Sequence, residues 1–222
     1  MPFQALVDVD FWQVNVVSED SRIFWQCYLR YNGDYKVTPL YYPVSMDAAV
    51  ADSFIGTTIA LYKQQRRWAY GVENIPYFLF GFKKNKEIPK RKKFRRAFTI
   101  MEGLHSWATN ALIIFFLGWL PALVGGPAFQ ASVVSLNLPF LTGLIMGIAM
   151  FGLILSVVLS LLILPPRPTG FSRFKYIEMV LQWALFYITI IILGAIPALE
   201  AQTRLMLGKY MGFWVMPKKK LG

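Results

Sequence analysis

The sequence predicts a short α+β region followed by a group of membrane helices. Of its 222 residues, 56% are hydrophobic and only 16% are charged, which is too apolar for an ordinary soluble domain. Long apolar stretches fill the second half of the chain, whereas the first half mixes short apolar runs with turn signals. We therefore expect an α/β remnant at 1–46, an interface region at 47–100 and a membrane region at 101–222.

The first region reads as one helix between two extended segments. Residues 11–17 (FWQVNVV) and 35–43 (YKVTPLYYP) are rich in strand-forming residues, although Pro39 restricts the second to an edge or a broken strand. Residues 22–31 have a helical pattern, with Ser18 as the expected N-cap. This αβ piece is too short for a complete nucleotide-binding sheet.

The interface region begins with an amphipathic helix at 47–70. Its aromatic, apolar and amide side chains recur at spacings of three and four, which places them on one face. They are Val50, Phe54, Thr57, Leu61, Gln64 and Trp68. A helix of this kind just before a membrane span is expected to lie on the membrane surface.

A basic run follows at 83–96 (KKNKEIPKRKKFRR), with nine Lys and Arg residues. Such a run suits a nucleic-acid patch or a solvated linker, but it also suits a cytoplasmic segment beside a membrane span. The apolar stretches that come next favour the membrane alternative. We therefore expect anionic membrane lipids as partners and no nucleic acid.

Three apolar stretches are long enough to cross a bilayer, for which about 20 residues suffice. They occupy 107–124, 138–164 and 177–199. We expect the first two to cross. The third is ambiguous because Gly194 and Pro197, which break helices, stand near its end.

The positive-inside rule gives the orientation of these stretches. It places residues 1–100 in the cytoplasm, the uncharged loop 125–137 outside, and the loop 165–175, with three basic residues, inside. The tail at 204–220 carries five basic residues and also favours the inside. That requires the third stretch to break at Gly194–Pro197 and return as an amphipathic helix; a full crossing would leave the tail outside.

The chain has one cysteine, Cys27, and one histidine, His105. There is therefore no disulfide framework, no thiolate metal site and no His-rich zinc site. A histidine-based catalytic triad is improbable for the same reason.

The sequence Gln64-Gln65-Arg66-Arg67-Trp68 contains the pattern Gln-x-x-Arg-Trp. On a helix, Gln64, Arg67 and Trp68 share one face. Arg binds phosphate oxygens through its planar fork, and Trp offers an apolar surface to a sugar ring. The alternative is a polar and aromatic edge of a surface helix.

Upstream, Ser18-Glu19-Asp20 opens the predicted helix. Acidic residues there can simply offset the helix dipole. In a functional interpretation, one carboxylate acts as the general base that removes the proton of an acceptor hydroxyl.

The order of these features resembles the C-terminal part of membrane-embedded processive family 2 glycosyltransferases, the cellulose synthase and hyaluronan synthase group. Ser18-Glu19-Asp20 is similar to that group's Thr-Glu-Asp motif, which implies Asp20 as the base with Glu19 beside it. The Gln-x-x-Arg-Trp match implies that Gln64 and Arg67 hold the donor diphosphate and that Trp68 stacks under the acceptor sugar. The 44 residues from Asp20 to Gln64 are comparable with the family's spacing.

A weaker match lies in the tail. Phe213, Val215 and Lys218 fit the gating-loop pattern Phe-x-Val-Thr-x-Lys of cellulose synthases, but Met216 replaces the Thr. The alternative is an aromatic and basic anchor at the membrane interface.

The resemblance also implies parts that this sequence does not contain. The family's GT-A-type domain has a nucleotide-binding half with an Asp-x-Asp motif, and a divalent Mg or Mn ion serves the complete enzyme. Asp8-Val9-Asp10 spells that motif but stands too close to Asp20, so we expect a turn there and no metal ligand in this chain. A truncated gene product, a fragment, or one half of a split enzyme with its N-terminal half on a separate chain would explain the difference.

The expected function is therefore transfer of a sugar, with inversion, from a nucleotide-sugar to a polysaccharide or lipid-linked acceptor. The chain alone is expected to be inactive. It is expected in the cell membrane as a multi-pass protein with its catalytic face in the cytoplasm. The alternative is a non-catalytic multi-pass membrane subunit that binds anionic lipid and a partner protein.

Overall fold

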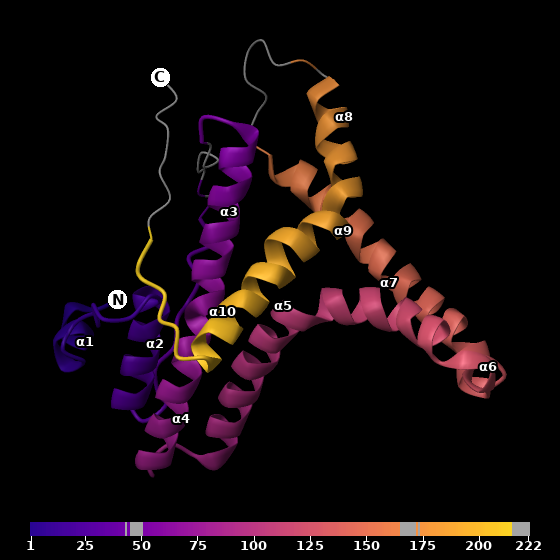
Figure 1. Cartoon of the computed structure of the whole chain (residues 1–222). Coiled ribbons are helices and arrows are strands. Elements are labelled where there is room, and N and C mark those ends of the chain that lie inside the picture. Colours follow the sequence, from indigo (N-terminus) through magenta and orange to yellow (C-terminus); the bar gives the residue numbers. More distant parts are fainter. Residues whose placement is uncertain (43, 45–50, 165–171, 173, 215–222) are drawn as a thin grey trace. The chain divides into compact units, whose positions relative to one another are not determined.

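The computed structural model describes residues 1–42, 44, 51–164, 172 and 174–214. Every regular element in those ranges is helical, and they contain no strand (Figure 1). The α-helices are α1 Phe3–Asp8, α2 Glu19–Arg30, α3 Phe54–Ala69, α4 Asn74–Lys84, α5 Lys90–Val124, α6 Gly126–Gln130, α7 Val133–Ile163, α8 Phe174–Leu181, α9 Phe186–Thr189 and α10 Ile196–Met206. Two 3₁₀ turns, η1 Tyr70–Glu73 and η2 Gln182–Leu185, and one π-helical segment, η3 Ile190–Ala195, complete the elements.

The predicted strand at 11–17 is wrong, because this segment is a series of turns and irregular residues. Phe11 has a φ of 61°, which lies in the left-handed region and not in the β region. The amide of the Gln26 side chain donates to the carbonyl oxygens of Val9 (3.0 Å) and Phe11 (3.1 Å). One side chain thus satisfies backbone groups that a neighbouring strand would otherwise have satisfied.

The predicted strand at 35–43 is also wrong over the described residues 35–42, which are irregular. Tyr35 packs against the rings of Phe24 and Tyr31, but Leu40 and Tyr41 are 90% and 96% exposed, so the second part of the segment is not packed against a described element. Pro39 also removes one backbone donor that a ladder would need. The α+β class is therefore confirmed for its helices and membrane-type segments but not for its strands.

The chain divides into two compact units. Unit 1 combines Met1–Thr109 with Ile192–Gly222, and unit 2 is Asn110–Ile191. The predicted site residues that the structure describes all belong to unit 1.

One core of unit 1 is an aromatic cluster between α2 and α4. Trp25 stacks on Phe78 with ring centroids 4.3 Å apart, and Tyr28 and Phe82 complete the cluster. α4 can approach this closely because it carries Gly81, where a Cβ atom would lie only 2.4 Å from a methyl carbon of Leu29.

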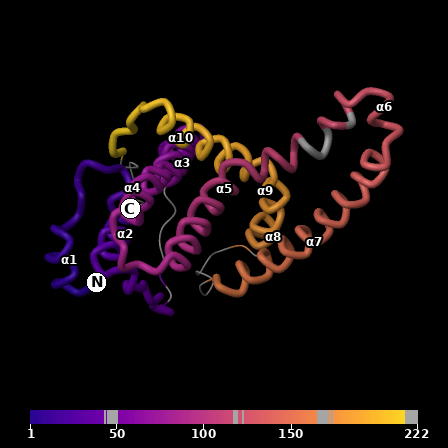
Figure 2. The backbone as a smooth tube through the Cα atoms, turned by 90° about the horizontal axis from the view of Figure 1, so that it is seen from below, coloured from indigo at the N-terminus to yellow at the C-terminus, as the bar shows by residue number. Residues whose placement is uncertain are grey.

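A second core joins α3 and η1 to α10 and the C-terminal tail. It consists of Val17, Ala69, Tyr70, Ala108, Ala198, Ala201 and Met211. Most of its helical members are alanines, which allow the helix backbones to approach closely. Figures 1 and 2 both show α10 running alongside α3.

The basic run contributes to the packing of unit 1. Lys93 Nζ donates to the carbonyl oxygens of Phe82 (2.6 Å) and Asn85, which closes the C-terminal end of α4. The guanidinium of Arg96 lies 5.6 Å from the ring centroid of Tyr28. Part of the run predicted to bind lipid therefore holds the fold of unit 1 together.

A buried carboxylate ties the start of α2 to the end of η1. Glu73 Oε1 accepts hydrogen bonds from the backbone N–H groups of Val17 (2.9 Å) and Ser18 (2.8 Å) and from the hydroxyl of Ser18 (2.7 Å). Ser18 stands at the predicted N-cap position, but its side chain makes no cap bond and donates to Glu73 instead. The turn before Asp20 is thereby fixed to η1.

Arg22 and Asn74 complete this polar network. Arg22 Nε donates to Asn74 Oδ1 (2.6 Å), and another of its guanidinium nitrogens donates to the Glu73 carbonyl oxygen (3.2 Å). Asn74 Nδ2 donates to the hydroxyls of Ser18 (3.0 Å) and Ser21 (2.9 Å). Burial lowers the pKa of Arg22, while the negative charge of Glu73 acts in the opposite direction.

Two helical segments in the described ranges are long and apolar enough to cross a membrane, α7 and the continuous helical run Phe174–Met206. The large apolar side chains along α7 are exposed, as a lipid-facing helix requires. The break expected at Gly194–Pro197 is not seen, because the helical run continues through a π-helical segment, η3, directly into α10. The apolar stretch predicted at 107–124 lies within α5. The structure does not describe the side chains of residues 117–119 and 122 in this helix.

We predict that Glu73→Gln destabilises unit 1 by about 2 kcal/mol, because it removes the charge that strengthens three buried hydrogen bonds. Cys27 is 0% exposed, so the rate at which a thiol reagent labels it measures opening of this unit. The matched control Glu87→Gln changes an exposed carboxylate and should leave the rate unchanged. Equal labelling rates for the two variants would contradict the anchoring role of Glu73.

Candidate functional site

The two sequence motifs meet in one cavity of unit 1, with a volume of about 330 Å³. The turn before α2 and the last residues of α3 form its walls, although they are far apart in the sequence. The lining residues are Val17, Ser18, Glu19, Asp20, Ser21, Arg67 and Trp68. The predicted base and two of the three predicted substrate-binding residues therefore surround the same space.

Asp20 occupies the first turn of α2 with an exposed side chain. Its Oδ1 accepts a hydrogen bond from the backbone N–H of Ser21 (2.7 Å). Glu19, which is half-buried, also borders the cavity. The carboxylates are thus held at a helix N-terminus, where the dipole favours negative charge, and Asp20 remains open to solvent.

Arg67 and Trp68 supply the opposite wall of the cavity. Trp68 is 49% exposed, so one part of its indole is available to a ligand. Gln64 lies one turn earlier on α3 and is half-buried, but it does not line this cavity. The structure thus brings Arg67 and Trp68 to Asp20 but does not bring Gln64 there.

Segment 210–214 of the C-terminal tail also reaches Arg67. The Phe213 ring centroid lies 5.0 Å from the Arg67 guanidinium carbon. Met211 is buried in the second core, and the Tyr210 hydroxyl donates to the Asn15 carbonyl oxygen (3.3 Å). Of the residues predicted for a gating loop, Phe213 is thus beside the site, whereas Val215 and Lys218 lie outside the described residues.

A group of polar side chains around one carboxylate, that of Glu200, joins α3 to α10. This group was not predicted from the sequence. Glu200 accepts hydrogen bonds from the Tyr62 hydroxyl (2.7 Å), Arg66 (2.6 Å) and Arg204 (2.7 Å). Burial and the bond to Glu200 raise the pKa of Tyr62 to about 12. The available signal was that Glu200 is the only acidic residue after Glu178.

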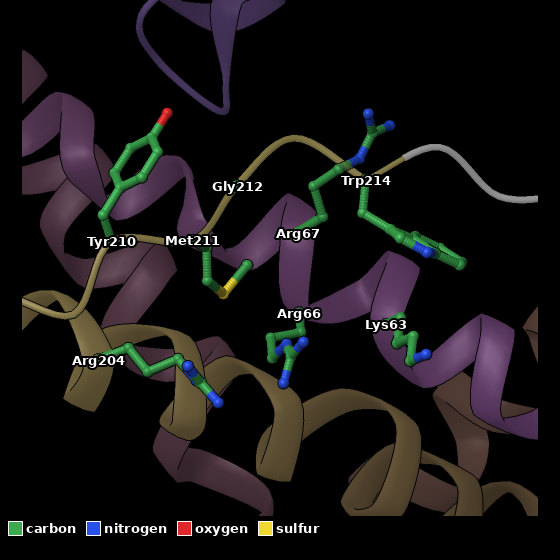
Figure 3. Close-up of a pocket in the computed structure, with 8 residues that line it drawn as sticks. All are labelled: Lys63, Arg66, Arg67, Arg204, Tyr210, Met211, Gly212 and Trp214. Carbon is green, nitrogen blue, oxygen red and sulfur yellow. The ribbon is translucent and has the colours of Figure 1, made fainter.

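A second cavity, of about 270 Å³, lies beside the first and shares Arg67 with it (Figure 3). Its lining residues are Lys63, Arg66, Arg67, Arg204, Tyr210, Met211, Gly212 and Trp214. In Figure 3 the side chains of Arg66 and Arg204 point toward each other, while Arg67 points toward the tail. This pocket therefore combines four cationic side chains with two aromatic rings.

The buried residues that hold the first cavity were also missed by the sequence interpretation. Glu73, Asn74 and Arg22 do not line it, but they fix the turn that carries Asp20. The one signal was that Glu73 is the only acidic residue between Asp52 and Glu87.

No group of three or more His, Cys, Asp or Glu side chains in the described part of the chain could hold a metal ion. The Asp8 carboxylate accepts hydrogen bonds from the Gln4 side-chain amide (2.8 Å) and from the Tyr31 hydroxyl (2.7 Å), so it is used in contacts within α1 and near the end of α2. Asp10 has a φ of 59°, as expected for a turn. These residues therefore do not fit the divalent ion that the family resemblance implies.

Comparison with protein-family models, with curated proteins and with solved structures found no match to this chain. The function proposed next therefore rests on the residues and contacts of the chain itself.

Proposed function

We propose that this chain is the membrane-bound acceptor half of an inverting family 2 glycosyltransferase. The observation that carries the proposal is the shared cavity, in which Asp20 faces the same space as Arg67 and Trp68. These are the side-chain types that the reaction needs: a base for the acceptor, a cation for the phosphate, and an aromatic surface for the sugar.

In the proposed reaction, the Asp20 carboxylate accepts the proton of the acceptor hydroxyl. The acceptor oxygen then forms a bond with the anomeric carbon, while the bond between that carbon and the donor phosphate oxygen breaks. The electron pair leaves with the nucleoside diphosphate, and Arg67 neutralises part of its charge. Attack from the face opposite the leaving group inverts the anomeric configuration.

Trp68 and Phe213 have distinct roles in this proposal. The exposed part of the Trp68 indole supports the acceptor sugar. Phe213 covers a face of the Arg67 guanidinium, whose N–H groups point outward in its plane and stay available to phosphate oxygens. Gln64 is assigned to the donor by the resemblance alone. The donor nucleotide would be held by a nucleotide-binding half that these residues do not include.

The division of the chain supports a membrane topology with an even number of crossings. The chain leaves unit 1 after Thr109 and rejoins it at Ile192. If unit 1 lies on one side of the membrane, an even number of crossings separates these points. Three apolar stretches then cannot all cross. With the basic residues of unit 1 inside, we propose a multi-pass protein of the cell membrane with its site at the cytoplasmic face.

The alternative is a non-catalytic membrane subunit that binds anionic lipid and a partner protein. One observation favours it: the described residues of 1–46, where a remnant of a glycosyltransferase α/β domain was expected, contain no strand. The two functions differ in whether the Asp20 carboxylate is needed for sugar transfer.

We predict that Asp20→Asn lowers sugar transfer by a factor of about 10² or more, because the acceptor loses its general base. The assay uses membranes of cells that produce the chain together with a nucleotide-binding half, and it measures incorporation of sugar from a set of nucleotide-sugars into lipid and polymer fractions. Asp34→Asn, an equal change at an exposed turn residue, serves as the control. If the Asp20→Asn variant transferred sugar at the wild-type rate, Asp20 would not be the base, and the non-catalytic subunit would be the favoured function.

We predict opposite labelling of two single cysteines introduced into a Cys27→Ala background. Ala131→Cys, in the turn after α6, should react with a membrane-impermeant maleimide in intact cells. Lys209→Cys, just after α10, should react only after the cells are permeabilised. Labelling of Lys209→Cys in intact cells would mean that the third stretch crosses fully.

A further inference from the structure

We propose that the cavity between α3, α10 and segment 210–214 is a binding site for a phosphate group. The shared chemistry is a phosphomonoester or a diphosphate, which can be carried by a soluble molecule or by a lipid headgroup. Of the two residues that the family resemblance assigns to a diphosphate, Gln64 and Arg67, only Arg67 lines this cavity, and the site adds Lys63, Arg66, Arg204 and Trp214 to it. It requires only the cavity itself and holds whether or not the chain transfers a sugar.

The charge of the cavity supports an anionic ligand. Four cationic side chains line it, and one carboxylate, Glu200, bonds two of them, Arg66 and Arg204. Within the described ranges, no carboxylate lies within ion-pair distance of Lys63 or Arg67. The cavity therefore holds more positive than negative charge, and cations crowded together in one pocket repel one another until an anion enters.

An unsatisfied donor points to the same conclusion. Arg66 Nε is buried and has no hydrogen-bond partner among the described residues. Buried donors without an acceptor are rare in folded proteins, because each costs about 1–3 kcal/mol. A phosphate oxygen, either directly or through a water molecule, would supply acceptors in this pocket.

The aromatic residues and the size of the cavity restrict the ligand further. Lys63 Nζ lies 5.7 Å from the ring centroid of Trp214, so the tail places an aromatic surface next to a cation without neutralising it. The volume of about 270 Å³ is below the range of about 300–1,000 Å³ typical of pockets that enclose a whole drug-sized ligand. The cavity therefore suits the phosphate end of a ligand whose remaining part lies outside it.

The position of Arg204 makes a lipid source reasonable beside a soluble one. Arg204 belongs to the last turn of the apolar helical run Phe174–Met206, where a membrane helix meets the headgroup layer. Arg, Lys, Trp and Tyr side chains are the usual partners of lipid phosphates at that depth. The same four residue types line this cavity.

Glu200 gives the proposal a second consequence. Its carboxylate occupies guanidinium donors of Arg66 and Arg204 that a phosphate would otherwise use, so it competes with the ligand. Removing its charge should therefore tighten phosphate binding, which is the opposite of the effect of removing a cation.

The soluble arm of the experiment is calorimetric titration of inorganic pyrophosphate into the full chain in a neutral detergent. We expect Lys63→Ala to weaken binding by about tenfold or more, Lys63→Arg to restore it, and Glu200→Gln to tighten it several-fold. Lys36→Ala and Glu178→Gln make the same charge changes at exposed residues that do not line the cavity, and they should have no effect.

The lipid arm measures binding of the same variants to neutral phosphatidylcholine micelles with and without phosphatidic acid. Displacement of pyrophosphate from the wild type by phosphatidic acid, together with weaker binding of phosphatidic acid by Lys63→Ala, assigns the site to a lipid headgroup. Pyrophosphate binding that phosphatidic acid leaves unchanged assigns it to a soluble phosphate. If neither Lys63→Ala nor Glu200→Gln changes the affinity for pyrophosphate or for phosphatidic acid, the proposal is wrong. Because no sugar transfer is measured, failure here is distinct from failure of the Asp20 assay.

Discussion

The hydrogen bonds of the Glu73 carboxylate hold together the part of the molecule on which its function depends. Glu73 follows α3 directly through η1, and it binds the backbone of the turn that opens α2. This link fixes the carboxylate of Asp20 relative to Arg67 and Trp68, which stand at the end of α3. A buried carboxylate is costly unless its hydrogen bonds are made, so the contact strongly favours one arrangement of the two helices.

The tail and α10 extend the same unit. Met211 enters the core formed by Val17 and Tyr70, and Glu200 joins α10 to α3 through Tyr62 and Arg66. Arg67 lines both the cavity that contains the carboxylates of Glu19 and Asp20 and the neighbouring cavity that is lined by cationic side chains. The proposed acceptor and phosphate sites are therefore neighbours because they share a single helix end. Segments from both ends of the chain are needed to build them.

The sequence predicted the helices of this protein better than its strands. Helix 22–31 and the interface helix were identified from periodicity, which depends only on neighbouring residues; α3 begins at Phe54, and the expected start at Asp47 lies outside the described residues. The two predicted strands are wrong because strand formation depends on a partner: Gln26 bonds the carbonyl groups of Val9 and Phe11, and no strand among the described residues pairs with the exposed segment around Leu40. Asp20, Arg67 and Trp68 were found through motifs, whereas Glu73 and Glu200 act through contacts with residues distant in sequence, which no local pattern contains.

The central claim is that the two motifs share one cavity, and cross-linking in membranes tests it most directly. In a Cys27→Ala background, Asp20→Cys and Trp68→Cys should be joined rapidly by a short bifunctional maleimide. Asp20→Cys paired with Phe54→Cys is the control, because Phe54 lies 14 residues away on the same helix as Trp68, or about 21 Å at 1.5 Å per residue. Cross-linking of the first pair alone is the predicted result. Equal cross-linking of both pairs, or none of the first, would contradict the shared cavity.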